Sequence, residues 1–222
     1  MTDAILLDLD GTLIDSTYYH AVAWQRALAS EGFEVPMWRC HRAIGLGGDK
    51  VVEHLVDAKA EDEHGDALRA AWKVLYEQLV SYVKPLPGAA DFVRAARERG
   101  FEVALATSGE QEFTDIALEM LGIEDELAAV VSTADVEASK PAPDLVEEAL
   151  KRVSPDRAVM VGDTTWDIAA AKKAGIGCIG VRTGGFGDDD LQDEGALAIV
   201  DDPRDLESLL LDGGDEYFSA VS

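Results

Sequence analysis

AILLDLDGTL, residues 4–13, is the stretch that decides the fold of this chain. It is a continuous apolar run that ends in two carboxylates, Asp8 and Asp10, followed by Gly11. A strand that is apolar on both faces is typical of the centre of a parallel sheet. Ligands of open α/β sheets bind at the carboxyl ends of the strands. The stretch therefore predicts a buried strand over residues 4–9 that delivers acidic side chains to a binding site.

Similar apolar runs recur later in the chain and alternate with helical patterns. The runs cover residues 101–106, 129–131, 158–161 and 176–181. The helical patterns cover residues 89–99, 113–121, 143–153, 166–174 and 203–211. Such alternation is typical of parallel strands that are joined by right-handed helical crossovers. We expect an α/β fold with a Rossmann-like core.

Residues 15–84 have a different pattern, with helices expected over residues 18–30, 49–58 and 67–83 and no strand-like run. The prolines of residues 84–88, KPLPG, disfavour helix and indicate a return hinge. We expect two parts: a core formed by residues 1–14 and 85–222, and a small α-helical cap domain, residues 15–84, inserted after the first strand.

Composition excludes several classes of protein. The chain has 222 residues, 47% of them hydrophobic, which is enough for a sizeable core. Its net charge of −25 argues against nucleic acid and anionic membranes as partners. No apolar run is long enough to cross a bilayer, and the first residues do not resemble a secretory signal. The two cysteines, Cys40 and Cys178, cannot form a disulfide framework, so we expect a cytoplasmic protein.

The acidity itself has two interpretations. The chain holds 25 Asp and 19 Glu, and only 8 of its 19 basic residues are Lys. Such a surface stays soluble in concentrated salt, where screening weakens self-repulsion. We therefore hypothesise a halophilic source, while an ordinary acidic cytosolic protein fits the composition equally well.

Polar side chains follow several of the predicted strands. Asp8 and Asp10 follow the first, Thr107 and Ser108 the second, and Lys140 stands in the loop after the third. The fourth run is followed by Asp163 and, four residues on, Asp167. Carboxylates that converge repel one another unless a cation intervenes, and hard oxygen ligands suit Mg²⁺. A metal beside Lys and hydroxyl donors makes a site for a phosphoryl group.

These residues carry a resemblance to a known family. The stretches DLDGTL (8–13), Thr107-Ser108, Lys140-Pro141 and GDTTWD (162–167) resemble the four ordered motifs of the haloacid dehalogenase-like superfamily. The helical insertion resembles the small cap of that family, in its phosphoglycolate phosphatase and β-phosphoglucomutase-like subgroup. The resemblance extends from Ile5 to about Leu211, and it implies an enzyme with Mg²⁺ as cofactor.

The resemblance implies a role for each motif residue. Asp8 is the expected nucleophile that forms an aspartyl-phosphate, and Asp10 the expected acid and base. Asp8, the backbone carbonyl of Asp10, and Asp163 are expected to hold Mg²⁺, with Asp167 completing or orienting its shell.

The remaining motifs are expected to contact phosphate. The Thr107 side chain and the backbone N–H of Ser108 are expected to bind phosphate oxygens. Lys140 is expected to neutralise the charge that builds up between Asp8 and the phosphoryl group. Simpler interpretations remain open: Thr107 can be a helix cap, Lys140 a surface side chain, and Asp167 the cap of a helix from Ile168.

Two reactions of the family remain in competition. Asp10 favours phosphoryl transfer over dehalogenation, so we predict a phosphatase acting on a small phosphorylated metabolite, with a phosphomutase as the alternative. In β-phosphoglucomutase-like members a His at the position of His20 assists near the acid/base Asp, although His20 can equally be packed inside the cap. Gly48 stands where the mutase has a phosphate-binding Arg, with Lys50 or Arg42 as replacements to consider.

The cap is where substrate selection is expected. Its aromatic residues can line a substrate pocket or belong to the core: Trp24, Trp38, Trp72, Tyr76 and Tyr82. A non-catalytic binding module is the third hypothesis, but it is expected to have lost one of the motif residues, and all are present. We expect a monomer or a homodimer.

Overall fold

The computed structural model describes residues 2–221, which fold around one central sheet. Its six parallel strands lie in the order β3-β2-β1-β4-β5-β6, and β7 pairs antiparallel with β4. The first strand, β1, thus lies at the centre, between β2 and β4, as the apolar run at residues 4–9 predicts. The strands are β1 (Asp3–Leu7), β2 (Glu102–Ala106), β3 (Ala129–Val131), β4 (Arg157–Gly162), β5 (Gly177–Val181), β6 (Ala198–Val200) and β7 (Ser219–Ala220).

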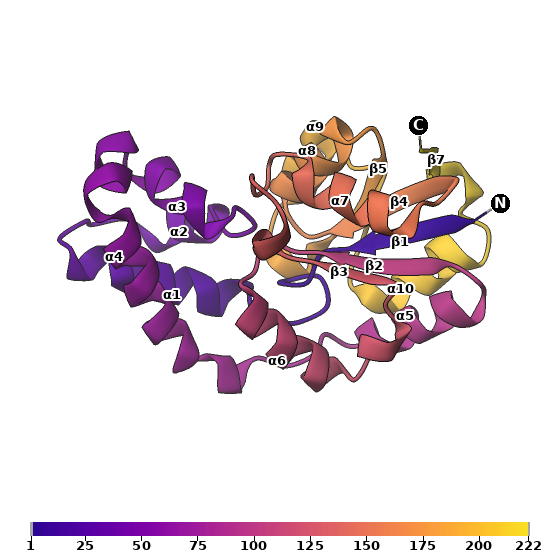
Figure 1. Ribbon diagram of the computed structural model, residues 1–222, viewed down its shortest axis with the longest axis horizontal. Helices are drawn as coiled ribbons and strands as arrows, with labels where there is room; N and C mark the ends of the chain where they lie inside the picture. Colours follow the sequence, from indigo (N-terminus) through magenta and orange to yellow (C-terminus); the bar gives the residue numbers. More distant parts are fainter. Residues whose placement is uncertain (1, 222) are drawn as a thin grey trace.

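Helices cover both faces of this sheet (Figure 1). Ile5 and Leu7 of β1 join the hydrophobic cluster under α5, α6 and α10, while Ala4 and Leu6 join the cluster under α7, α8 and α9. Successive side chains of a strand point to opposite faces, so one short run supplies two cores. The helices are α5 (Ala89–Glu98), α6 (Gln111–Leu121), α7 (Asp144–Val153), α8 (Thr165–Lys173), α9 (Asp188–Glu194) and α10 (Pro203–Leu206), the last extended by a π-helical turn over Glu207–Leu211.

Four helices between β1 and β2 form a separate group at one end of the molecule, far from both termini (Figure 1). They share a third hydrophobic cluster, which includes Trp24, Leu28, Leu68 and Trp72. The helices are α1 (Thr17–Ser30), α2 (Met37–Arg42), α3 (Gly48–Leu55) and α4 (Ala58–Glu77).

Element boundaries depart from the sequence prediction in the helical group. The expected helix over residues 49–58 ends at Leu55, because the Asp57 side chain accepts the backbone N–H of Ala60 and begins a new helix there. As a result α4 begins nine residues earlier than expected. The sequence did not predict α2, whose six residues are too few to show a period. It also did not predict the short strands β6 and β7.

Three consecutive acidic residues, 188–190, form the first turn of α9. Acidic residues at a helix N-terminus are stabilised by the helix dipole. No helix within residues 2–221 is both long enough and apolar enough to cross a membrane.

Candidate active site

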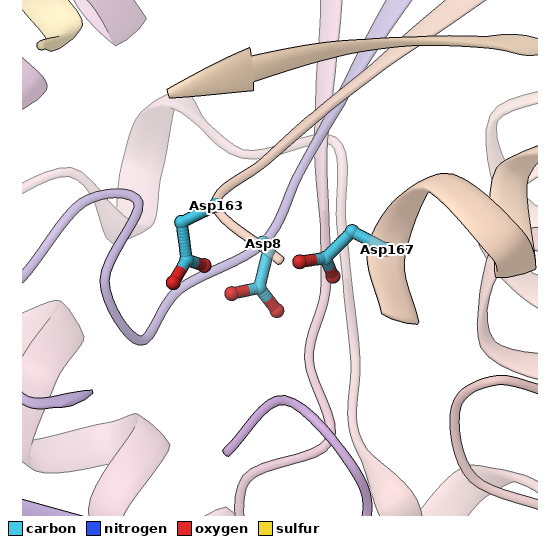
Figure 2. A group of neighbouring side chains, drawn as sticks. All are labelled: Asp8, Asp163 and Asp167. Carbon is cyan, nitrogen blue, oxygen red and sulfur yellow. The ribbon is translucent and has the colours of Figure 1, made fainter. Parts of the chain in front are cut away.

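Three buried carboxylates meet at the carboxyl ends of the central strands. Asp8 follows β1, Asp163 follows β4, and Asp167 lies in the first turn of α8. One oxygen atom from each lies within 4.8 Å of the other two. Figure 2 shows Asp163 and Asp8 side by side, with the carboxylate of Asp167 turned toward Asp8. The expected convergence of the first and fourth motifs is therefore present in the structure.

Lys140 lies between two of these carboxylates. Its Nζ is 2.5 Å from Asp8 Oδ1 and 2.7 Å from Asp167 Oδ1, and its side chain has no exposed surface. Burial alone lowers the pKa of a lysine, but Asp167 and Asp8 outweigh it, so that the pKa of Lys140 is raised and the ammonium group stays charged. The surface interpretation of Lys140 is thus wrong.

One lysine does not neutralise three buried acids. Burial, only partly opposed by Lys140 and reinforced by Asp167, raises the pKa of Asp8 to about 7. Burial and the neighbouring Asp167 and Asp8 also raise the pKa of Asp163 well above its usual value. Burial is the main cause of both raised pKa values, and the mutual repulsion of the carboxylates adds to it.

The surroundings of Asp163 fit a metal ligand. Its Oδ1 accepts a hydrogen bond of 3.1 Å from Thr12 Oγ1. Among residues 2–221, no partner is found for its buried Oδ2. A Cβ atom added to Gly11 would lie 2.3 Å from Oδ2, and one added to Gly184 would lie 1.8 Å from it. An unpaired buried oxygen within a group of carboxylates is the donor set that Mg²⁺ prefers.

Asp167 has two tasks at once. Its Oδ2 accepts from the Thr164 backbone N–H at 3.0 Å and from Thr164 Oγ1 at 2.6 Å, while Oδ1 faces Lys140. Thr164 and Asp167 form a capping box at the start of α8. The helix therefore begins at Thr165, with Thr164 as its N-cap, and not at Ile168. Capping locks the carboxylate in place beside Lys140.

Asp10 points away from the acidic group and toward α1. Its Oδ1 accepts from Ser16 Oγ at 2.5 Å and lies 2.9 Å from His20 Nε2. Burial raises the pKa of Asp10, but the His20 and Ser16 contacts outweigh it, and the net pKa is lowered. His20 is 7% exposed and stacks on Tyr76 with ring centroids 3.8 Å apart. It is therefore packed inside the helical group and in contact with Asp10 at the same time.

The two hydroxyl residues after β2 lie at the same edge of the sheet. Thr107 Oγ1 accepts the Gly109 backbone N–H at 3.0 Å, so it shapes the loop and does not cap α6, which begins at Gln111. The buried Ser108 Oγ has no hydrogen-bond partner among the described residues. Both residues line the cavity above Asp8.

A cavity of about 320 Å³ separates the acidic site from the helical group. Asp8, Asp10 and Thr107 line its base, and His20, Trp24, Trp72 and Arg69 line its far wall. Such a volume suits a small metabolite. Of the cap aromatics considered from sequence, Trp24 and Trp72 thus line the cavity, and Tyr76 is buried beside them.

Several side chains considered from sequence lie elsewhere. Trp38 and Tyr82 are 68% and 63% exposed and belong neither to the cavity nor to the core. Arg42 forms a bidentate ion pair with Asp190, at 2.6 and 2.8 Å, and Lys50 pairs with Asp49 at 3.3 Å. Neither Arg42 nor Lys50 lines the cavity. Neither therefore takes the place of the phosphate-binding Arg that the mutase has at the position of Gly48.

The sequence interpretation missed two features of this site. Arg69 lies on α4, and no local motif marks it, because its position depends on how α4 packs against α1 and α3. Gly184 lies in a turn after β5 and presses its backbone against Asp163, although only the fold brings the two together. Gly11 and Thr12 do belong to the first quoted stretch, and their contact with Asp163 explains that part of the motif.

Comparison with known proteins agrees with this geometry. Residues 5–181 match the profile of the family described as haloacid dehalogenase-like hydrolase. A phosphoglycolate phosphatase of Aquifex aeolicus is 32% identical over 77% of this chain and 80% of its own length. The crystal structure of a hydrolase from Pseudomonas syringae is 32% identical, with a TM-score of 0.89 over 96% of this chain and 99% of the other.

A β-phosphoglucomutase from Clostridium difficile superposes with a TM-score of 0.81 over 96% of each chain at 18% identity, which bears on the fold alone. The matches confirm the predicted α/β fold, the predicted resemblance and the prediction of an enzyme of the phosphatase type. The chain belongs to the haloacid dehalogenase-like hydrolase family.

Proposed function

We propose that the protein is a Mg²⁺-dependent phosphatase that hydrolyses a small phosphorylated metabolite through an aspartyl-phosphate on Asp8. One observation carries the proposal: Asp8 lies at the base of the cavity, in contact with Lys140 and beside the carboxylates of Asp163 and Asp167. Residues 15–84 act in this proposal as a cap that closes the cavity.

The chemistry is a double displacement at phosphorus. A carboxylate oxygen of Asp8 attacks the phosphorus atom, and the ester P–O bond breaks. Asp10 protonates the departing alkoxide; His20, 2.9 Å from Asp10, can supply that proton. Asp10 then takes a proton from a water molecule that attacks the aspartyl-phosphate, which releases inorganic phosphate and restores Asp8.

The residues around Asp8 stabilise the charge of these steps. Lys140 faces the attacking carboxylate, and in this proposal Thr107 and the backbone N–H of Ser108, both at the lining of the cavity, hold phosphate oxygens. Asp8, Asp163, Asp167 and the backbone carbonyl of Asp10 are the groups that would hold Mg²⁺ or orient its shell. Bound Mg²⁺ would supply positive charge that lets a phosphate dianion approach the carboxylates.

The phosphomutase alternative needs a second phosphate site opposite Asp8. The contact between His20 and Asp10 is compatible with it. Gly48 offers no side chain for such a site, and neither Arg42 nor Lys50 lines the cavity. Arg69 does line the cavity and is a cation that either reaction could use. The phosphatase comes first because the 32% identical relative is named a phosphoglycolate phosphatase. The product separates the two reactions: free phosphate from the phosphatase, or an isomerised sugar phosphate from the mutase.

The name of the Aquifex aeolicus relative makes phosphoglycolate the first ester to test, and sugar phosphates come next. We expect the protein to act in the cytoplasm, as a monomer or homodimer, without nucleic-acid or membrane partners. Each of these expectations rests on composition and the resemblance.

The test is phosphate release from a panel of small phosphate esters, each with Mg²⁺ and with EDTA. We expect metal-dependent release, lowered at least about 1,000-fold in Asp8→Asn, because the nucleophile is lost while the side-chain volume is kept. Asp91→Asn, at an exposed position on α5, is the matched control and should release phosphate as the wild type does.

Release that persists in Asp8→Asn would contradict the nucleophile assignment. Release that is equal with EDTA would contradict the metal. Turnover of a sugar phosphate without net phosphate release would favour the mutase.

A further inference from the structure

Arg69 is the one Lys or Arg among the described residues that line the cavity. It projects from α4, in the wall that faces the acidic site. Its side chain is 27% exposed, so its charge is only partly screened by solvent. A cation placed opposite the phosphoryl end of a cavity is positioned to meet the other end of a small substrate.

A glycine inside α4 leaves room for the contact that holds this arginine in place. Arg69 Nη1 lies 2.8 Å from a carboxylate oxygen of Glu61, two helical turns earlier on the same helix. Arg69 Nη2 donates a 2.9 Å hydrogen bond to Asp66, whose side chain is fully exposed and open to exchange for a substrate carboxylate. Gly65 lies between Glu61 and Arg69, and a Cβ atom there would come within 2.4 Å of Glu61 Oε1 and 2.8 Å of Arg69 Nη2. Glycine in a helix interior costs stability relative to alanine. At this position it leaves the space through which Glu61 and Arg69 reach each other.

The space on the cavity side of Arg69 is open because of Gly48. Atoms of Arg69 and Trp24 lie 3.8 to 4.0 Å from the point where a Gly48 side chain would begin. Arg69 Nη1 also approaches the Gly48 backbone carbonyl at 3.3 Å. The missing side chain of Gly48 therefore leaves the stem of Arg69 and the Trp24 ring uncovered.

We propose that Arg69 is a specificity-determining residue that binds a carboxylate at the far end of the substrate. Glu61 is its positioning residue, and the missing side chain of Gly65 leaves the space for their contact. The proposal rests on the proposed phosphatase function. The planar guanidinium group matches a carboxylate in bidentate geometry, which a point charge such as Lys does not.

The other charged residues of the lining are acidic, so Arg69 determines whether the cavity accepts an anionic group. Asp49, Glu110 and Glu137 also line the cavity; Lys50 and Lys73 lie 3.3 Å from the first two, and the remaining negative charge would repel a second anionic group on the substrate. Without Arg69, the cavity would therefore favour a neutral or cationic leaving group. The preference for an anionic group thus depends on one side chain.

The test compares two esters of nearly equal shape, phosphoglycolate and its neutral amide, glycolamide phosphate. We expect the wild type to prefer the acid by about 10- to 100-fold in kcat/KM, the range of one charged hydrogen-bond partner. In Arg69→Met the ratio should fall to about 1 or below, and Arg69→Lys should restore part of it. Lys59→Met, at an exposed position on the same helix, should leave the ratio unchanged.

Gly65→Ala tests the gap without removing any charge. Alanine is the better helix former, so the variant should not lose thermal stability. Its Cβ would displace the Glu61–Arg69 contact, and we expect the acid-to-amide ratio to fall several-fold. A lower ratio in a variant of unchanged melting temperature would separate positioning from folding.

The outcomes distinguish this inference from the proposed function. Phosphate release from both esters at equal rates, or a ratio that Arg69→Met leaves unchanged, would overturn the role of Arg69 while the phosphatase stands. A wild-type preference for the amide would show that the acidic lining dominates, and would also overturn it. No release from any ester would overturn the phosphatase itself.

Discussion

At the scale of single residues, the site is a balance between buried acids and one buried base. Lys140 contacts two of the three carboxylates, and Asp163 keeps an oxygen without a partner among the described residues. The acids are therefore held together at the expense of stability until a cation or protons neutralise them. Proton and metal compete for the same oxygens.

This competition predicts how stability depends on pH. The pKa of Asp8 rises from 3.8 to about 7 on folding, so the folded, metal-free protein binds a proton that the unfolded chain releases. Between those values stability falls as pH rises, by at most about 1.4 kcal/mol per pH unit. We expect the metal-free melting temperature to drop between pH 5 and pH 7, and the gain on adding Mg²⁺ to grow over the same interval.

Thermal unfolding with and without Mg²⁺ at several pH values measures both effects. Asp8→Asn removes one of two acids with a raised pKa and should make the dependence less steep, while Asp163 retains part of it. A metal-free stability that rises steadily between pH 5 and pH 7 would contradict the assignment of a raised pKa to Asp8.

At the scale of elements, the short helix α2 joins the helical group to the core. Its Arg42 forms the bidentate pair with Asp190 of α9, and His41 Nε2 lies 2.8 Å from the Gly184 carbonyl oxygen. Trp166 of α8 donates a 3.1 Å hydrogen bond to the Arg42 carbonyl. Because Gly184 also presses on Asp163, the contacts of α2 reach the wall of the acidic site.

Removing the Arg42 pair should loosen this junction. Partly exposed ion pairs contribute up to about 1 kcal/mol. Arg42→Ala should therefore raise about five-fold the fraction of molecules in which α2 has come away from α9. Hydrogen exchange should become faster in α2 and unchanged in β1 and β4. Arg157→Ala removes a comparable bidentate pair with Asp3, at the start of β1 and β4 and so opposite the edge that faces the helical group, and is the matched control. Equal acceleration in both variants would argue against a junction at α2.

At the scale of the whole molecule, the net charge of −25 is the dominant feature. Buried carboxylates account for a few of these charges, and the rest lie largely on the surface, where they repel one another. The described structure contains many local ion pairs, but 44 acids face only 19 bases. The fold therefore tolerates a large excess of negative charge.

Salt should stabilise the protein, and the concentration range separates the two interpretations of its acidity. Screening of surface charges is largely complete near 0.5 M, where the Debye length is a few ångströms. For an ordinary acidic protein we expect the melting temperature to rise with KCl and then level off. For a halophilic protein the melting temperature should rise further between about 1 and 3 M KCl, where screening is already complete. No gain up to molar KCl would contradict the halophilic hypothesis.

The sequence by itself determined the class of fold and the identity of the acidic site. Apolar runs have the length of buried strands, and polar residues directly after them must lie at one edge of a parallel sheet. For this reason the sequence predicts that Asp8, Asp163 and Asp167 lie close together. The position of Lys140 beside them is predicted from its place in the family resemblance. The roles of these residues in catalysis stay predictions.

Only the tertiary structure decided what the helical group contributes. The packing of α3 against α4 brings together Arg69, Gly65 and Gly48. The helix α2 is too short to leave a periodic pattern in the sequence. Contacts between residues far apart in sequence depend on packing between elements, and local preferences do not encode it. The acidic site lies at an edge of the sheet, and its position follows from the order of the strands, which the hydrophobic pattern of the sequence reveals. The cavity wall formed by the helical group follows from side-chain packing, which that pattern does not reveal.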